Sequence, residues 1–304
     1  MPARAVPAAA PPELPAPPRR VVSLVPSVTE SLFDLGLGKA VAGVTDYCIH
    51  PAEAVAGLPK VGGPKNPQLE AILALQPDLV IANREENTPA VVRALEAAGV
   101  PVWVTFPNTV AETVAFLRDL AALFRSPAAE RRAEAIAQAV EAARRLPRRR
   151  WRYFVPIWEG ETRGLRWWMT FNRHTYPHDL LALLGGENIF ADRQRRYPLE
   201  ADLGLAPERP APGRDRRYPR VRLEEIVAGQ PEVVLLPDEP CTYDARGREA
   251  MLALLAETPA GREGRVFLVD GTLLFWFGAR LAKAVAVLVE VIGGVGLQDA
   301  RPWP

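Results

Sequence analysis

The sequence predicts an α/β fold with two lobes, each built from strand-helix repeats around a mostly parallel sheet and joined by one long helix. Three observations predict it. Short apolar runs alternate with helical stretches from Arg20 onward. An Ala-, Glu- and Arg-rich stretch divides the chain near its middle, and a segment of the first half recurs in the second. A length of 304 residues suits two domains.

The first half, residues 20–125, alternates expected strands and helices. Buried strands are expected at 21–25, 41–45, 79–82 and 102–104. Ser27 and Thr109 each begin a Ser/Thr-x-x-Glu capping box, and Asn66 and Thr88, each followed by proline, begin two further helices. Such a run of strand-helix units forms a parallel sheet covered on both faces.

The stretch 126–147 is expected to be a single helix, with Ser126 as its N-cap, Pro127 at the first position and Pro147 as its end. About 20 residues at ~1.5 Å each span roughly 30 Å, enough to bridge two lobes. An ordinary amphipathic surface helix is the alternative. The second lobe then covers 148–304 and resumes the strand-helix pattern.

An internal repeat supports two similar lobes. Residues 69–80 align without a gap with residues 223–234, and seven positions are identical, including the Gln-Pro pair. Both copies read as a helix, a break and a buried strand. We therefore expect the same unit in each lobe, with a ligand cleft between the lobes.

Two segments depart from this pattern. Residues 1–19 are rich in Pro and Ala and contain no apolar signal-peptide core, so we expect them to form a disordered arm. From the sequence as it stands, we expect a cytoplasmic location. A start further upstream would instead place the protein in the periplasm or at the cell surface. An inserted loop, 192–217, begins an Arg- and Pro-rich stretch in which Arg-Arg-Tyr-Pro occurs at 195–198 and again at 216–219. It is expected to be a solvated loop, with an anion-binding flap as the sharper hypothesis.

Composition excludes several classes of protein. Lys plus Arg count 37 and Asp plus Glu 36, so no net field would attract nucleic acid. Two cysteines and three histidines are too few for a disulfide framework or a Cys-rich zinc module, and no metal site is expected. No run of about 18 apolar residues predicts a membrane span. We expect a monomer without an intrinsic cofactor.

Ligands of open α/β sheets bind beyond the carboxyl ends of the strands. In the first half this rule selects Pro26, Ser27, Asp46, Tyr47, Cys48, Asn83, Arg84 and Phe106. In the second half it selects Trp158, Asp238, Glu239 and the segment 274–280, which contains Trp276, Phe277 and Arg280. Trp151, Trp167 and Trp168 also fall near expected strand ends. Aromatic faces bind large flat ligands, and Arg84, Arg166 and Arg280 would pair with pendant carboxylates or phosphates. Packing within its own lobe is the alternative for each tryptophan.

Enzyme motifs are weaker. Gly62-Gly63-Pro64-Lys65 lacks the order of a phosphate-binding loop, and no nucleophile elbow is present. His174 and His178 flank Pro177, which begins a helix and leaves His174 outside it, so the pair is poorly placed for a metal.

The chain resembles the substrate-binding proteins of ABC importers that carry a helical backbone between two lobes, in particular the cobalamin- and iron-chelate-binding subgroup. The resemblance runs from about Arg20 to Ile292 and rests on motifs in a fixed order: 20–30, 43–48, 76–80, 175–181, 185–188, 269–271 and 277–280. It implies cleft residues at Pro26, Ser27, Tyr47 or Cys48, Asn83 and Trp276. Tyr176, which lies within the 175–181 motif, is a further candidate ligand-binding residue. In members that dock to a permease, an acidic residue early in one helix of each lobe meets arginines of the transporter. Here those places hold Pro89 and Tyr243, and the nearby acids are Glu85, Glu86, Glu239 and Asp244.

The resemblance implies a non-enzymatic protein that binds a corrinoid such as cobalamin, haem or an iron chelate for an ABC permease. Two other functions stay open. A chelatase-type enzyme acting on a tetrapyrrole would need His174, His178 or Glu239. An intracellular metal chaperone would use Cys48 and His50.

Overall fold

The computed structural model describes residues 9–146 and 149–293, which form two compact units. Unit 1 comprises the described residues up to Val140 together with Trp276–Ala282, and unit 2 comprises Glu141–Phe275 and the described residues from Lys283 onward. Helix α6 (Pro127–Arg144) passes through the boundary at Val140, so the helix expected between the halves is present. The prediction of two α/β lobes with mostly parallel sheets is confirmed.

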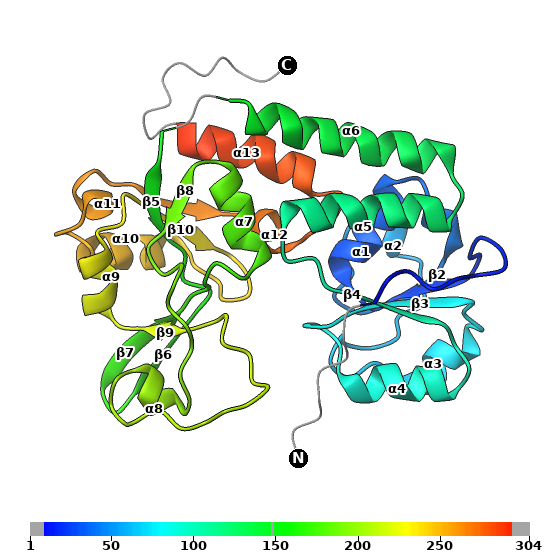
Figure 1. Ribbon diagram of the computed structural model, residues 1–304, viewed down its shortest axis with the longest axis horizontal. Helices are drawn as coiled ribbons and strands as arrows, with labels where there is room; N and C mark the ends of the chain where they lie inside the picture. The colour runs from blue at the N-terminus through cyan, green and yellow to red at the C-terminus, as the bar shows by residue number, and fades with distance from the viewer. Residues whose placement is uncertain (1–8, 147–148, 294–304) are drawn as a thin grey trace. The chain divides into compact units, whose positions relative to one another are not determined.

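Unit 1 contains a parallel four-stranded sheet in the order β2-β1-β3-β4. Its strands are β1 (Val21–Ser23), β2 (Val41–Val44), β3 (Leu79–Asn83) and β4 (Val102–Thr105). Its other helical elements are α1 (Pro26–Asp34), η1 (Gly38–Ala40), α2 (Ala52–Val55), α3 (Leu69–Ala74), α4 (Pro89–Ala97) and α5 (Val110–Leu123). Helices α3 and α4 cover one face of this sheet, and α1 and α5 cover the other (Figure 1). Val22 and Val80 point to the α3 and α4 side, where they pack with Ile72 and Leu95.

Unit 2 contains a second parallel sheet, in the order β11-β10-β5-β8, and a small antiparallel sheet, β6-β7-β9. Its strands are β5 (Trp151–Phe154), β6 (Trp158–Thr162), β7 (Leu165–Met169), β8 (Gly186–Asn188), β9 (Arg220–Val221), β10 (Val233–Pro237) and β11 (Val266–Val269). Its helices are α7 (Tyr176–Leu183), α8 (Leu199–Asp202), α9 (Leu223–Gly229), α10 (Ala245–Leu254), α11 (Pro259–Arg262), α12 (Thr272–Phe275) and α13 (Leu281–Gly293), whose first two residues belong to unit 1. Figure 1 shows α9, α10 and α11 on the side of the parallel sheet away from α7.

The two copies of the sequence repeat adopt the same structure. The first forms α3 and β3, and the second forms α9 and β10. The glutamine of each Gln-Pro pair ends its helix in the left-handed region, Gln76 at φ 47° and Gln230 at φ 46°. The acid two residues later also has the same role, because Asp78 accepts from the amide of Arg20 and Glu232 from the amide of Arg152. The repeat is therefore a structural duplication.

The two capping boxes predicted from sequence have different outcomes. Thr109 and Glu112 form the reciprocal bonds of the motif at the start of α5. The capping box at Ser27 was wrong: Val25 is the N-cap of α1, Pro26 is in the first turn, and Ser27 lies within the helix. Glu30 binds Arg280 instead of the helix start. Proline is favoured at the first position of a helix, which moves the cap one residue upstream of it.

The Arg- and Pro-rich stretch is not a simple solvated loop. It forms α8 and β9, and β9 pairs with β7. The Asp202 side chain has no exposed surface and accepts hydrogen bonds from Arg193 Nη1 and from the amides of Arg196 and Arg220. One buried carboxylate therefore ties together both ends of the insertion.

The part of the expected N-terminal arm that the structure describes contacts unit 1. Ala9 donates its amide to Val104 O at 3.0 Å, and its carbonyl accepts from Trp103 Nε1 at 3.1 Å. Ala9, Phe106 and Phe116 help to line a pocket of about 210 Å³ beside β4. Residues 1–8 lie outside the described range.

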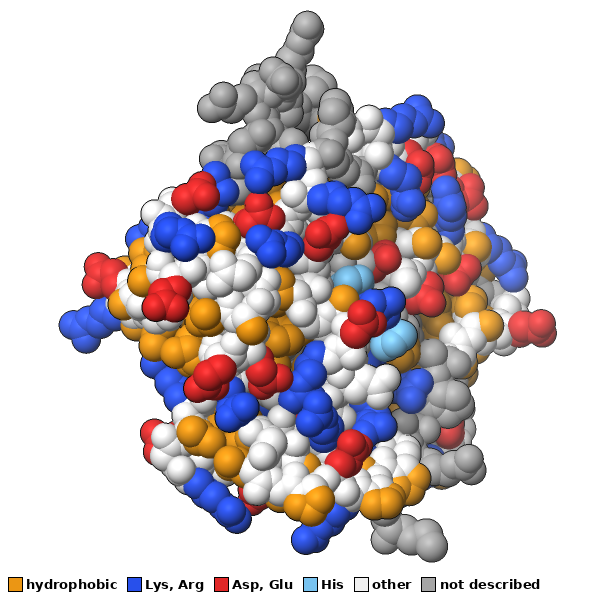
Figure 2. Space-filling view, turned by 60° about the vertical axis from the view of Figure 1, so that its left-hand side comes forward, with side chains coloured by type: hydrophobic (Ala, Val, Ile, Leu, Met, Phe, Trp, Pro, Cys, Tyr) orange, Lys and Arg blue, Asp and Glu red, His pale blue; other side chains and the backbone are white. Residues whose placement is uncertain are grey.

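Across residues 9–146 and 149–293, no helix combines the length and apolar character that crossing a bilayer requires. Acidic and basic side chains are interspersed over the face shown in Figure 2, as the near-zero net charge leads one to expect.

Candidate functional site

The carboxyl ends of the unit 1 strands gather most of the residues selected from the first half of the sequence. Four of them are buried: Pro26, Ser27, Cys48 and Asn83. Ser27 Oγ is enclosed without a hydrogen-bond partner. The Asn83 side chain accepts from the amide of Glu85 at 2.8 Å and donates to Thr105 Oγ1 at 3.5 Å, so it holds the turn after β3.

Cys48 also has a structural environment. Its side chain is 0% exposed, and Thr29 Oγ1 donates to its sulfur at 3.1 Å. Burial raises the pKa of the Cys48 thiol, so the thiol stays protonated at neutral pH. A protonated, enclosed thiol is a poor metal ligand, and this argues against the chaperone alternative.

The exposed part of this edge is aromatic. In the turn after β2, Tyr47 is 64% exposed and Ile49 is 54% exposed, although most large apolar side chains are buried. His50 in the same turn packs edge-on against Trp276, with 5.7 Å between ring centroids. We call Tyr47, Ile49, His50 and Trp276 the aromatic edge. Exposed apolar side chains that lie close together, as Tyr47 and Ile49 do in this turn, are typical of a binding surface.

Arg84 directly follows β3, and Phe106 directly follows β4, the neighbouring strand of the same sheet. The guanidinium carbon of Arg84 lies 4.9 Å from the centre of the Phe106 ring, and Arg84 is exposed. This pair presents a cation on an aromatic support at the same edge of the sheet.

The segment 276–282 corrects an expectation. Trp276, Phe277 and Arg280 were assigned to the second half of the molecule, but they group with unit 1. Phe277 is buried against Phe116 at 5.5 Å between ring centroids. Arg280 is 6% exposed and binds Glu30 through two hydrogen bonds of 2.7 and 2.6 Å, so it is not available to a ligand carboxylate. The guanidinium carbon of Arg280 also lies 5.1 Å from the centre of the Trp276 ring, so the guanidinium stacks against that indole.

In unit 2, the hairpin of β6 and β7 was not expected from the sequence, and it determines which tryptophan side chains are exposed. β6 and β7 pair around Arg163 and Gly164, and Trp158 at the start of β6 is 47% exposed. Trp168 on β7 is 1% exposed, so it is a core residue. Tyr176 at the start of α7 is buried with its hydroxyl unpartnered, and burial raises its pKa far above the usual range. Of the three, Trp158 alone presents a surface for binding.

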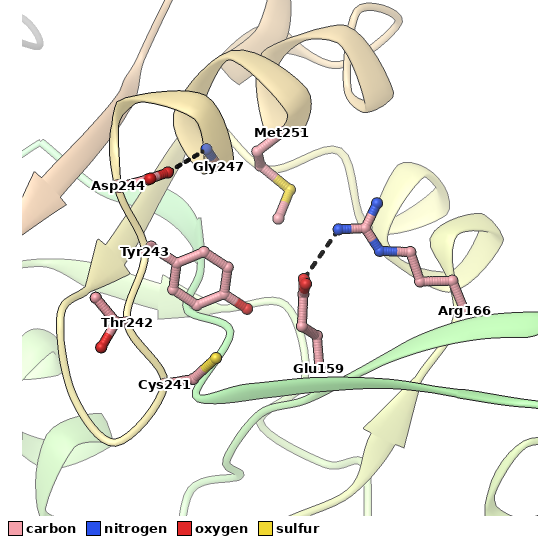
Figure 3. Close-up of a pocket in the computed structure, with 8 residues that line it drawn as sticks. All are labelled: Glu159, Arg166, Cys241, Thr242, Tyr243, Asp244, Gly247 and Met251. Carbon is pink, nitrogen blue, oxygen red and sulfur yellow. Dashed lines mark hydrogen bonds and ion pairs between the residues drawn. The ribbon is translucent and has the colours of Figure 1, made fainter.

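A polar pocket of about 180 Å³ lies in unit 2 between β6, β7 and the start of α10 (Figure 3). Glu159 forms an ion pair with Arg166 at 3.0 Å, and the Tyr243 hydroxyl is buried without a hydrogen-bond partner. Burial, followed by the charge of Glu159, raises the pKa of both Cys241 and Tyr243. The thiol and the phenol are therefore neutral, and the pocket offers hydrogen bonds rather than a nucleophile.

The acids expected to dock to a permease lie after β3 and β10. Glu85 is exposed, whereas Glu86 and Glu239 are half-buried. Asp244 caps α10 by accepting from the amide of Gly247 at 2.8 Å. These acids therefore follow the equivalent strands of the two repeats.

The residues that a chelatase would need are not assembled. His178 Nδ1 is 3.5 Å from the Tyr153 hydroxyl, and burial lowers the pKa of His178. Within the described ranges, no three His, Cys, Asp or Glu side chains are grouped to hold a metal ion.

Residues 21–273 match the family model described as periplasmic binding protein, which covers most of the chain and both strand-helix repeats. The chain belongs to the periplasmic binding protein family. This family identity agrees with the exposed aromatic edge, which offers apolar surface to a ligand.

Relatives of this periplasmic binding protein are recognisable by sequence and by fold. The vitamin B12-binding protein of Yersinia pestis (strain Pestoides F) is 30% identical over 223 residues, which are 71% of this chain and 69% of that protein. The periplasmic heme-binding protein RhuT from Roseiflexus sp. RS-1, solved in apo form, has a TM-score of 0.71 and 26% identity, with 91% of this chain and 98% of that chain covered. The periplasmic vitamin B12 binding protein BtuF of Vibrio cholerae has the same TM-score at 24% identity and covers 92% and 99%, which shows the shared fold.

Sequence reasoning missed part of the aromatic edge of this periplasmic binding protein. Ile49 was not selected, and His50 was considered only as a metal ligand. Both lie in the turn that already contained Tyr47, so extending the candidate site along that turn would have found them.

Proposed function

We propose that this protein captures a corrinoid, haem or a ferric chelate and delivers it to an ABC importer. Its family membership and the ligands named for its relatives, vitamin B12 and heme, support this class of function. The observation that carries the proposal is the aromatic edge, where Tyr47 and Ile49 present exposed apolar surface at the same end of the unit 1 sheet as the cation of Arg84.

The ligand class follows from the chemistry of this edge. Flat macrocycles and chelates offer large apolar faces and peripheral carboxylates. Covering an aromatic side chain that is already fixed costs little conformational entropy, and each contributes about 1.5–3 kcal/mol when fully covered. Trp276 is held by His50 and Arg280, so it is already placed before a ligand arrives. Arg84 then pairs with a peripheral carboxylate.

Visible absorption spectroscopy tests this function. The protein is incubated separately with hydroxocobalamin, haem and ferric chelates and then desalted, and the retained colour is measured. Retention of at least one colour is expected. Loss of all of them on desalting would contradict the proposal.

Single substitutions test which residues contact the ligand. Tyr47→Ala and Trp276→Ala should each weaken binding by about tenfold, corresponding to about 1.4 kcal/mol. Leu268→Ala is the matched control, because Leu268 is an exposed apolar residue of unit 2 outside the site and is 43% exposed. Equal losses in all three variants would contradict the assignment of the aromatic edge.

The transport partner forms part of the same proposal. Glu85, Glu86, Glu239 and Asp244 are the candidate contacts to permease arginines, and we propose a periplasmic or cell-surface location in which the protein acts as a monomer. Charge reversal at Glu85 and Asp244 together should abolish stimulation of the cognate transporter in vesicles while leaving ligand binding intact. Unchanged stimulation would remove these acids from the interface, and sedimentation velocity measures the oligomeric state.

A further inference from the structure

The Arg- and Pro-rich stretch 192–222, called the Arg-rich insertion from here on, carries more positive charge than its own acids neutralise. Residues 192–222 contain nine arginines and five acidic residues, in a chain whose net charge is only +1. Each of the five acids already forms an ion pair: Asp192 with Arg173, Glu200 with Arg163, Asp202 with Arg193, Glu208 with Arg216, and Asp215 with Arg217. Among the described residues, Arg195, Arg214 and Arg220 therefore have no carboxylate within 4.0 Å.

The two Arg-Arg-Tyr-Pro copies lie side by side and hold this part of the insertion in place. The amide of Arg195 donates to Arg216 O at 2.9 Å, and Arg216 Nε donates back to Arg195 O at 3.1 Å. Tyr197 is buried, and its hydroxyl donates to Asp215 O. The sequence repeat thus produces a fixed aromatic platform.

Two of the unpaired arginines stack on that platform. The guanidinium carbons of Arg195 and Arg214 each lie 4.4 Å from the centre of the Tyr197 ring, so they are no more than 8.8 Å apart. Stacking fixes the plane of a guanidinium while leaving its N–H edge free to donate. Arg195 Nε is buried and has no hydrogen-bond partner.

Arg220 adds a third positive charge to this group. It is half-buried, and its Nη1 donates to Tyr218 O at 2.8 Å. Burial, followed by the positive charge of Arg195, lowers the pKa of Arg220. Like charges held close together are unfavourable, and such arrangements concentrate at functional sites.

The frame beneath these side chains is rigid. The enclosed carboxylate of Asp202 accepts from the amides of Arg196 and Arg220, so the backbone on both sides of the group is fixed from the interior. The backbone of Arg220 and the backbone next to Arg195 are therefore held in place.

We propose that Arg195, Arg214 and Arg220 form a binding site for a phosphoryl group. Guanidinium forks bind phosphate oxygens with paired, charge-assisted hydrogen bonds, and a tetrahedral dianion neutralises several arginines at once. The site lies in the insertion of unit 2 and shares no residue with the aromatic edge of unit 1. Its phosphoryl group belongs either to a soluble phosphate compound or to a lipid headgroup.

Isothermal titration calorimetry with inorganic pyrophosphate tests whether the site binds a soluble phosphate compound. Saturable binding is expected, and Arg195→Ala combined with Arg214→Ala should lower the affinity at least about tenfold, since hydrogen bonds to charged groups are strong. Arg209→Ala is the matched control, because Arg209 is an exposed arginine of the same insertion without a stacking partner, and it should change the affinity less than about twofold. Raising the NaCl concentration should weaken binding in the wild type.

Co-sedimentation with phosphatidylcholine vesicles containing phosphatidylglycerol tests, with the same variants, whether the site binds a lipid headgroup. Binding of pyrophosphate or of vesicles that is lost in the double variant and kept in Arg209→Ala supports the site and identifies the source of its phosphoryl group. Binding of neither, or equal loss in the double variant and in Arg209→Ala, overturns the proposal. Thermal melting confirms folding, and Arg214→Ala alone replaces the double variant if that variant does not fold, because Arg214 is exposed.

Discussion

The ion pair between Arg280 and Glu30 should contribute strongly to the stability of unit 1. The Arg280 side chain is 5% exposed and that of Glu30 is 20% exposed, and the two residues are 250 positions apart in the chain. Glu30→Gln would leave a buried guanidinium without its carboxylate. Breaking a buried pair by removing one partner costs about 3–5 kcal/mol, and we expect a loss in that range.

A second ion pair on the same helix provides the control. Arg132 binds Asp34 of α1 through bonds of 2.8 and 2.9 Å, but the side chains are 46% and 29% exposed. Solvent screens this pair, so Arg132→Gln should cost only about 0–1 kcal/mol. Replacing Glu30 and Arg280 together with methionine should cost less than either single change, because no buried charge is left alone.

Urea unfolding measures these free energies, and amide hydrogen exchange reports on the anchored segment directly. The Ala279 amide donates to Ser31 Oγ at 3.0 Å in a buried position, so its exchange should accelerate in Glu30→Gln and stay slow in Arg132→Gln. If the two variants lose equal stability, or if the Ala279 amide exchanges at the wild-type rate in both, the reasoning is refuted.

Three further predictions concern separate parts of the chain. Gly278→Ala should lower stability by about 1–3 kcal/mol, because φ is +106° and a Cβ would lie 2.2 Å from Ser31 Oγ; Gly204→Ala, at φ +74° in open space, should lower the melting temperature less. Ellman's reagent should label Cys241 in the native protein and Cys48 only after unfolding, so labelling of both native thiols would contradict the burial of Cys48. Burial lowers the pKa of His178 below 6.5, so the unfolded chain binds this proton more readily, and stability should fall as the pH drops below 6.5; an unfolding curve for His178→Gln that keeps the full wild-type dependence would contradict this.

The fold was predictable because its signals are local. Apolar runs, capping residues and the Gln-Pro break each act within a few positions, and the left-handed Gln76 and Gln230 show that the repeat encodes backbone geometry as well as composition. Thr109 illustrates the same point, since both partners of its cap lie within three residues.

The site was harder to predict, because some of its side chains have partners that lie far away in the sequence. Ser27 and Thr109 begin the same motif, but the partner of Glu30 is Arg280, which no local pattern connects to it. The hairpin of β6 and β7 turns at Arg163 and Gly164, both at positive φ, and Arg-Gly is a weaker hairpin signal than Asn-Gly. Without the hairpin, Trp158 and Trp168 could not be distinguished, although one is exposed and the other buried.

The duplication shows where the two units have diverged. The repeats imply that β1 and β5 are equivalent, since each pairs with the strand of its repeat, β3 or β10. After β1 the chain enters α1 at Pro26, with two residues between strand and helix, whereas after β5 it forms the β6-β7 hairpin before α7 begins at Tyr176. The Arg-rich insertion likewise follows β8, the second strand to join that sheet.

Both additions of unit 2 therefore leave from the carboxyl ends of its parallel strands, which is the edge where α/β sheets bind ligands. Insertions that only filled space would be equally suited to the opposite ends of the strands. The functions proposed above account for this placement, because one addition carries the exposed Trp158 and the other the stacked Arg195 and Arg214. In unit 1 the proposed binding residues need no such addition, because Tyr47 and Ile49 are exposed in the turn after β2 and Trp276, from the far end of the chain, packs against His50 of that turn.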